Sequence, residues 1–211
     1  MSGPQFDPAF LENLDELLKW RRDVRRFSKA PLPEGALHRL LAVASLAPSV
    51  GLSEPWRFVT VDEPGRRAKV QESFRKVNAE ALGGYAGDKA KLYASLKLEG
   101  FEAPGHVAVF CDSTTTKGGE LGRTSMPETA EYSVVAAIQI IWMVARAQGL
   151  GLGWVSILDP HEVTAALDVP GHWKLVAYLC VGIPAEESLE PELQKAGWEG
   201  RMKPEDFILK R

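Results

Sequence analysis

The apolar run from Val134 to Ala145 restricts the fold more than any other part of this sequence. It forms the middle of a predicted helix over Pro127–Gln148, which Gly149 ends. Because the run is apolar nearly all round, other elements must cover most faces of that helix. Alternating or apolar runs rich in strand-forming residues predict the strands that could do so, at Trp56–Val61, Val107–Cys111, Trp154–Ile157 and Leu175–Val181. The helical patterns outnumber the strands, so we expect an α+β layered fold with a mostly antiparallel sheet.

Further helices are expected at Pro8–Phe27, Gly35–Ala47 and Arg66–Val77, and from Asp159, which has a proline at the next position and an acid at the third. A polar, flexible section is expected from Gly83 to Gly100, and a long loop over 114–126. The 211 residues predict a single domain over 1–211, whose polar residues 185–211 form a C-terminal arm. We expect Trp198 in this arm to need burial on a partner subunit.

Composition excludes several functions. The chain has 25 basic and 28 acidic residues, a net charge of −3, so we expect no nucleic-acid partner. Cys111 and Cys180 lie in apolar runs and are expected to be reduced core residues. No signal-peptide pattern is visible, and the apolar run is shorter than a bilayer requires. These features predict a soluble, cytoplasmic protein without a membrane partner.

Positive charge is concentrated in one place, between Lys19 and Phe27. Leu17, Trp20, Val24 and Phe27 have helical spacing, which predicts one buried helical seam. Arg21, Arg22 and Arg25 would then share a flank around the carboxylate of Asp23. Planar guanidinium groups on an anchored element suit a phosphate or another polyanion. The alternative is a solvated helix end, where cations offset the helix dipole.

The sequence has no nucleophile motif, no P-loop and no spacing typical of a metal site, so we expect no metal. Two more segments could let a backbone approach a flat ligand: the break Ala47–Gly51 before Pro55-Trp56, and the glycine-rich stretch Gly149–Gly153 before Trp154. A turn that ends the helix is the alternative explanation of the glycines.

Taken in order, these segments resemble the motifs of the nitroreductase-like flavoprotein family, over most of the chain. The family has Arg-Arg-Ser-x-Arg-x-Phe, then Ala-Pro-Ser-Ser-x-Asn-x-Gln-Pro-Trp-x-Phe, then Gly-Leu-Gly-x-x-Trp. The corresponding segments here are Arg21–Phe27, Ala47–Phe58 and Gly149–Trp154. Three departures stand out: Asp23 replaces Ser or Thr, Leu52 replaces Asn and Ser156 replaces Gly. Glu54 also stands where Gln is usual, with no role that we can assign from the sequence.

These departures, together with the segments Ser95–Gly100, Leu121–Thr124, Trp154–Ile157 and Pro191–Trp198, are similar to one subfamily of the family. That subfamily consumes reduced flavin mononucleotide (FMN) with O2. That resemblance implies fragmentation of the flavin to 5,6-dimethylbenzimidazole, the lower ligand of vitamin B12, with release of erythrose 4-phosphate. The alternatives are an NAD(P)H-dependent FMN nitroreductase or flavin oxidoreductase, and a binding module without turnover.

The resemblance also implies roles for individual residues. Asp23 and Ser156 would be catalytic, and the expected flavin contacts are Arg21, Arg22, Arg25, Pro48, Ser49, Gly51, Gly153, Trp154 and Val155. Simpler roles stay open: an ion-pair partner of Arg22 or Arg26 for Asp23, a helix-stop serine for Ser49 and a strand-end hydroxyl for Ser156. The sections 83–100 and 114–126 would form a lid, in which Arg123 is either a flavin contact or a solvated cation. The family resemblance implies a homodimer with flavin at its interface, and we expect a separate flavin reductase.

Overall fold

The computed structural model describes residues 3–211 and contains one four-stranded sheet. The strands are β1 (Trp56–Thr60), β2 (Gly105–Cys111), β3 (Gly151–Val155) and β4 (Lys174–Gly182). Their order is β1-β2-β4-β3, and each neighbouring pair is antiparallel. The α+β fold with an antiparallel sheet is therefore confirmed, and β1 and β3 lie at its opposite edges.

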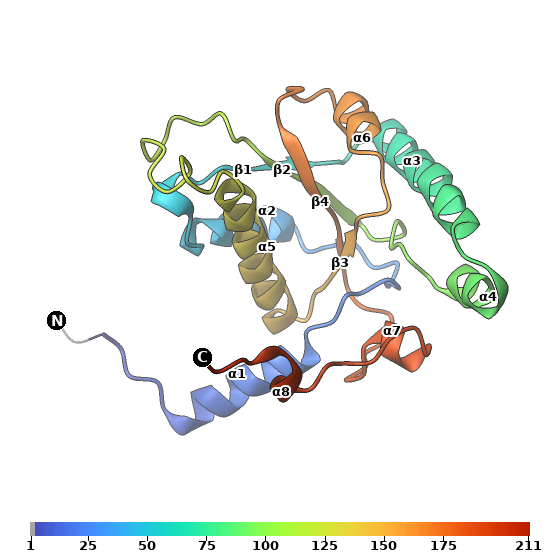
Figure 1. Ribbon diagram of the computed structural model, residues 1–211, viewed down its shortest axis with the longest axis horizontal. Coiled ribbons are helices and arrows are strands. Elements are labelled where there is room, and N and C mark those ends of the chain that lie inside the picture. The colour runs from blue at the N-terminus through green and yellow to red at the C-terminus, as the bar shows by residue number, and fades with distance from the viewer. Residues whose placement is uncertain (1–2) are drawn as a thin grey trace.

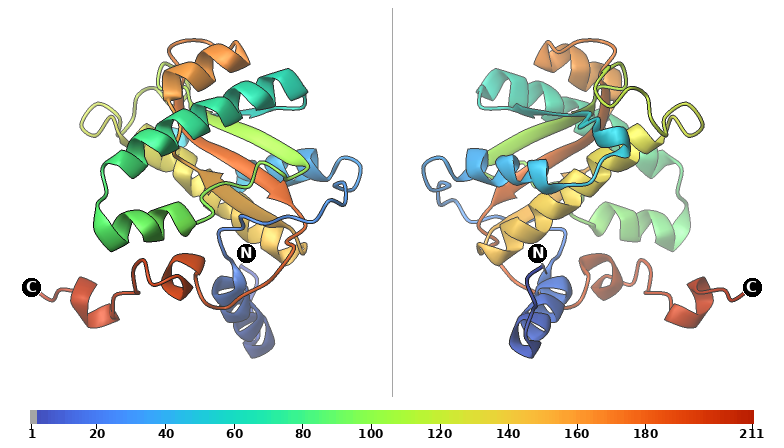
Figure 2. Two further views of the ribbon diagram at one scale, coloured as in Figure 1. Left: turned by 90° about the vertical axis from the view of Figure 1, so that its right-hand side faces the viewer. Right: turned by 90° about the vertical axis from the view of Figure 1, so that its left-hand side faces the viewer.

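Helices cover both faces of the sheet (Figures 1 and 2). Helix α5 (Thr129–Ala147), with α2 (Ala36–Ala42) and the 3₁₀ helix η1 (Val43–Leu46), packs on one face, and α3 (Pro64–Gly83) and α6 (Pro160–Leu167) pack on the other. Alternate residues of β2 serve the two layers: Val107 and Val109 face α5, whereas Phe110 faces the α3 side. A strand covered on both faces has no solvent-facing side, which explains why Val107–Cys111 in β2 is apolar throughout.

Helix α5 is the central core helix, and eight of its residues are buried. It has 19 residues and a mean hydropathy of 1.2, so length and composition alone would let it cross a membrane. The expectation of a segment too short to span a bilayer considered only Val134–Ala145, the apolar middle of this helix. A buried core helix passes the same test, and α5 packs against β2, β3 and β4.

Several sequence predictions are confirmed. Asp159 caps α6 by accepting hydrogen bonds from the backbone N–H groups of His161 (2.7 Å) and Glu162 (3.1 Å). Cys111 and Cys180 are buried free thiols. Burial raises the pKa of the Cys111 thiol to about 11, so it stays protonated at neutral pH.

The predicted helix Pro8–Phe27 is wrong beyond Trp20. Helix α1 covers Pro8–Trp20, and residues 21–27 are extended beside the edge strand β3. The backbone N–H of Val24 donates to the carbonyl of Leu152 (3.1 Å), and that of Ser28 donates to the carbonyl of Ile183 (2.8 Å). This pairing with a distant strand overrides the local helical spacing. Of the expected seam, only Phe27 is fully buried.

Other elements also differ from those predicted: α3, for example, continues to Gly83, beyond the expected end at Val77. The section 83–100 contains helix α4 (Gly87–Ser95), so it is not an irregular polar stretch. Strand β3 begins at Gly151 and ends at Val155, which places most of the glycine-rich stretch in a strand. Two short helices, α7 (Glu192–Lys195) and α8 (Pro204–Phe207), lie in the C-terminal arm, and η2 (Val50–Leu52) follows the Pro48 break.

Candidate functional site

Glycines on β3 allow the cationic segment to lie directly against the sheet edge. A Cβ on Gly153 would lie 2.1 Å from the carbonyl oxygen of Val24, and one on Gly151 would lie 2.8 Å from the Val24 side chain. Neither position can carry a side chain without moving the neighbouring segment. Gly151 and Gly153 therefore allow close packing, whereas Gly149, with φ +73°, ends the helix.

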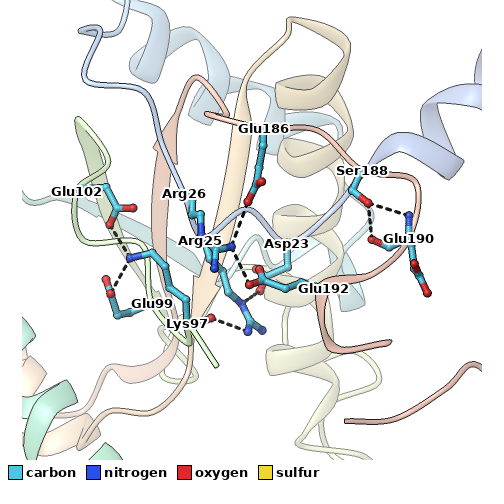
Figure 3. Close-up of polar contacts among 10 residues, drawn as sticks. All are labelled: Asp23, Arg25, Arg26, Lys97, Glu99, Glu102, Glu186, Ser188, Glu190 and Glu192. Atoms are coloured by element: carbon cyan, nitrogen blue, oxygen red, sulfur yellow. Dashed lines mark hydrogen bonds and ion pairs between the residues drawn. The ribbon is translucent and has the colours of Figure 1, made fainter. Parts of the chain in front are cut away.

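Asp23 is fixed at this edge from two sides. Its Oδ1 accepts from the backbone N–H of Trp154 (2.8 Å). Its Oδ2 accepts from Arg25 Nε (2.9 Å), as Figure 3 shows. The partner of Asp23 is thus Arg25, not Arg22 or Arg26. The side chain remains about a third exposed (31%), so a ligand can still reach this oriented carboxylate.

The arginines do not share one helical flank, because their segment is extended. The Arg21 guanidinium lies over the Trp142 ring, 4.8 Å from its centroid, and burial lowers its pKa. Burial, and then the charges of Arg201 and Arg21, lower the pKa of Arg22. Arg22 donates through Nε to the carbonyl of Leu189 in the arm (3.0 Å).

An open cleft of about 560 Å³ lies beside Asp23. Arg22, Arg25 and Arg26 line one side of it, and the arm lines the other with its glutamates. Arg26 pairs with Glu186 (3.2 Å) and Glu192 (2.8 Å) across this cleft. Its volume falls in the range of small-molecule sites, and its guanidinium groups suit a phosphate.

Ser156 follows β3, two residues after the Trp154 amide that contacts Asp23. This places its Cα about 7 Å further along the chain. Ser156 is exposed, and within residues 3–211 its hydroxyl makes no hydrogen bond to the protein. Trp154 is half-buried near Trp142, and Val155 is buried in the layer of α3 and α6. The structure thus brings Asp23, Gly153 and Trp154 together, with Ser156 nearby.

Pro48, Ser49 and Gly51 lie elsewhere, before the opposite edge strand. The backbone N–H of Val50 donates to Ser133 Oγ (3.0 Å), whereas Trp142 Nε1 donates to the Arg22 carbonyl (3.1 Å). Ser133 and Trp142 are nine residues apart on α5, so these two anchor points are about 14 Å apart. One chain therefore does not gather all the predicted flavin contacts around one ring.

The segment at Ser49 is held by its own chain. Ser49 Oγ accepts from the Glu54 backbone N–H (3.1 Å), which is a local turn contact. Gly51 has φ +57°, and a Cβ there would lie 2.9 Å from the Leu121 carbonyl oxygen. Leu52 follows with φ +54° and is 68% exposed.

The loop between β2 and α5 lies over that segment. Lys117 in the loop forms an ion pair with Glu54, the position whose role the sequence left open. Arg123 donates to the carbonyls of Ser113 (3.1 Å) and Thr115 (2.8 Å). Its guanidinium, which is partly exposed, therefore holds the loop together.

Sequence reasoning missed the contribution of the arm. Trp198 packs in the same chain against Tyr85 and Tyr93, with centroid distances of 5.5 and 6.0 Å, and Lys89 Nζ lies 3.8 Å from the centre of its ring. Trp198 therefore does not need a partner subunit to be covered. The signal available in the sequence was the run of glutamates between Glu186 and Glu192, which complements the arginines.

The geometry describes an α+β protein whose sheet edge borders a cleft lined by both arginines and glutamates, with the fixed carboxylate of Asp23 beside it. The nitroreductase family model matches residues 18–183, and the chain belongs to that family. A 5,6-dimethylbenzimidazole synthase of Rhodospirillum rubrum is 55% identical over 201 residues, covering 95% of both chains.

Two solved structures share the fold. One is an oxidised iodotyrosine deiodinase bound to FMN and 3-iodo-L-tyrosine, with a TM-score of 0.72 and 23% identity; 94% of this chain and 97% of that one are covered. The other is a BluB-like flavoprotein from Clostridium difficile, with a TM-score of 0.68 and 21% identity, covering 94% and 98%.

Proposed function

We propose that this protein fragments reduced FMN with O2 to give 5,6-dimethylbenzimidazole, the lower ligand of vitamin B12, and erythrose 4-phosphate. The observation that carries the proposal is the 55% identity to a 5,6-dimethylbenzimidazole synthase along nearly the whole of both chains. The protein is then an oxidoreductase for which FMN is a substrate. Dimethylbenzimidazole contains no oxygen, so the oxygen taken up leaves with the other fragments.

The cleft beside Asp23 fits the flavin substrate. It is large enough for a small molecule, and several guanidinium groups lie around it. Arg22, and Arg21 from the neighbouring pocket over Trp142, would bind the phosphate or the polar edge of the ring, since planar donors match phosphate oxygens in pairs. Arg25 would assist them; its donors are bound to Asp23 and Lys97, as those of Arg22 are bound to the carbonyls of Leu189 and Arg21. Gly153, Trp154 and Val155 would present β3 to the flavin.

Asp23 and Ser156 would carry the proton transfers. Breaking the ring system requires protons to move at several atoms, and a carboxylate is a competent general base when a substrate proton lies within hydrogen-bond reach. The contacts with Trp154 and Arg25 orient Asp23 before the substrate arrives. Ser156 offers an exposed hydroxyl that can donate or accept without adding charge.

A homodimer would complete the site. Pro48, Ser49 and Gly51 lie too far from Asp23 within one chain, so a second copy would supply them. Helix α1 has no buried residue and exposes Phe10, Leu11 and Leu14, which a partner could cover. The end of the arm, residues 199–211, exposes apolar side chains that could also pack on the partner.

The section 83–100 and the loop 114–126 would serve as a lid that keeps water from the reacting flavin. We propose a cytoplasmic location, with a separate reductase that supplies reduced FMN.

A single incubation tests the function. Purified protein is mixed with chemically reduced FMN without oxygen, air is admitted, and dimethylbenzimidazole is sought by chromatography and mass spectrometry. Its formation supports the proposal. Recovery of oxidised FMN alone, with reduction of a nitro compound once NAD(P)H is added, would instead identify an ordinary flavin nitroreductase.

A further inference from the structure

The connection between α4 and β2 is tied to the segment that carries Asp23. Arg25 Nη1 donates to the backbone carbonyl of Lys97 (2.8 Å). Further along, Gly100 packs beneath Phe27, where a Cβ would lie 2.6 Å from a ring carbon. The two segments are therefore joined by a charge-assisted hydrogen bond and by close packing.

The side chain of Lys97 holds this connection in shape. Its ammonium pairs with Glu99 Oε1 (2.9 Å) and Glu102 Oε2 (3.2 Å), while Glu99 Oε2 accepts from the backbone N–H of Phe101 (2.7 Å). Figure 3 shows the Lys97 carbonyl bound to Arg25 and its ammonium lying between the two carboxylates. Lys97 is only 26% exposed, so solvent screens these pairs less than those of a fully solvated lysine.

Arg25 connects the Lys97 carbonyl to the carboxylate of Asp23. Its side chain is 14% exposed, and Nε and Nη1 are bound to different segments, which fixes the plane of the guanidinium. If the Lys97 carbonyl moved, Arg25 would lose one of these two anchors. Asp23 would then be held firmly only at Oδ1, by the amide of Trp154, and its second oxygen could rotate.

We propose that Lys97 is a positioning residue for the reaction. It acts through Arg25 to hold the carboxylate of Asp23 in its productive orientation, and it does not contact the flavin. This inference rests on the proposed function. It also gives a role to the segment Ser95–Gly100, whose first two residues line the cleft.

The test compares Lys97→Met, Lys97→Arg and the control Lys174→Met, which removes an exposed ion pair with Glu131 elsewhere on the molecule. Each enzyme, in excess over reduced FMN, is exposed to air. The measured quantity is dimethylbenzimidazole formed per reduced FMN supplied, because flavin that O2 only reoxidises gives no product. Oxidised FMN affinity is measured separately by fluorescence quenching.

We expect Lys97→Met to lower this ratio about tenfold, because small displacements of a reacting group have large effects on rate. Its FMN dissociation constant should stay within about twofold, since the arginines facing the cleft remain. Lys97→Arg should restore the ratio, because a guanidinium can bind both carboxylates. Lys174→Met should match the wild type.

Glu102→Gln provides a second measurement that does not depend on Lys97→Met folding. It removes one of the two carboxylates, so the ratio should fall in the same direction by a smaller factor. Product formation by the wild type with unchanged ratios in these variants would overturn the role of Lys97 alone. Absence of product from the wild type would instead refute the proposed function.

Discussion

At the scale of single residues, Asp23 combines a fixed orientation with access to solvent. One oxygen is bound to the amide of Trp154 and the other to the Arg25 guanidinium, yet the side chain borders an open cleft. A residue that served only as an ion-pair partner would not need the additional bond to the backbone of β3. This arrangement suits a group that must hold one geometry while a substrate changes around it.

Asp23→Asn should abolish dimethylbenzimidazole formation and leave the affinity for FMN within about threefold. The amide oxygen can still accept from Trp154, but the variant has no carboxylate to act as a base. Single-turnover product analysis and fluorescence titration measure the two quantities. Asp168→Asn is the matched control, because Asp168 has a left-handed backbone (φ +55°) that asparagine also tolerates. Retained turnover in Asp23→Asn would remove Asp23 from catalysis.

His106 links β2 to β4 inside the core. Its Nε2 lies 3.0 Å from the carbonyl of Ala103, which can only accept, so Nε2 donates; Nδ1 then accepts from the Tyr178 hydroxyl (3.0 Å). Burial, and then the charge of Arg67, lower the pKa of His106 from 6.5 to about 4. The neutral ring is therefore the form that the folded protein accommodates.

This pKa predicts a loss of stability in mild acid. Between pH 6.5 and about 4 the unfolded chain binds a proton at His106 that the folded chain does not, so the contribution is complete above pH 6.5 and declines as pH falls. The loss by pH 4 is about 3 kcal/mol. Urea unfolding at several pH values measures it. His106→Gln should be less stable at pH 7 but lose this part of the slope, whereas His38→Gln should keep it.

At the scale of elements, the edge of the sheet depends on two glycines. Gly153→Ala should lower the free energy of unfolding by about 2 kcal/mol, because its methyl group would collide with the Val24 carbonyl. Gly171→Ala is the control, since nothing lies within 4 Å of the added group. Chemical denaturation compares the two variants. Equal stability of both would show that the 21–27 segment does not pack on β3 as described.

The same edge shows what sequence patterns can and cannot predict. Buried strands and the core helix were predictable, because a short apolar run such as Val107–Cys111 must be buried, and a buried strand accommodates it. The end of α1 was not, because Trp20, Val24 and Phe27 keep helical spacing while a partner more than a hundred residues away sets their conformation. Asp23 and Trp154 were both expected to act on the flavin. Their direct hydrogen bond was not expected, because it depends on the pairing of residues 21–27 with β3. Lys97 and Glu192 stand in segments that resemble the subfamily, but only the folded chain places them near Arg25 and Arg26.

At the scale of the whole molecule, the predicted flavin contacts fall into two groups. One surrounds Asp23 at the β3 edge, and the other precedes β1 at the opposite edge. Their anchors on α5 are about 14 Å apart. Two copies related by a two-fold axis could bring one group of each chain to the same flavin, which would give two equivalent sites per dimer.

A shared site makes activity recoverable from two inactive chains. Asp23→Asn disables one group and Gly51→Val the other, because a β-branched residue is strained at φ +57° and would collide with Leu121. In a mixed dimer, one site takes Asp23 from the second chain and Gly51 from the first, and is intact. Random assortment makes about half of the dimers mixed and restores about a quarter of all sites.

Co-expression of the two variants with different affinity tags, followed by tandem purification, isolates the mixed dimer. Dimethylbenzimidazole formed per dimer, with reduced FMN in excess, should then reach about half of the wild-type value, because one of its two sites is intact. Each variant alone must elute as a dimer and remain inactive. An inactive mixed dimer, or a wild type that light scattering shows to be monomeric at micromolar concentration, would mean that each chain binds flavin by itself.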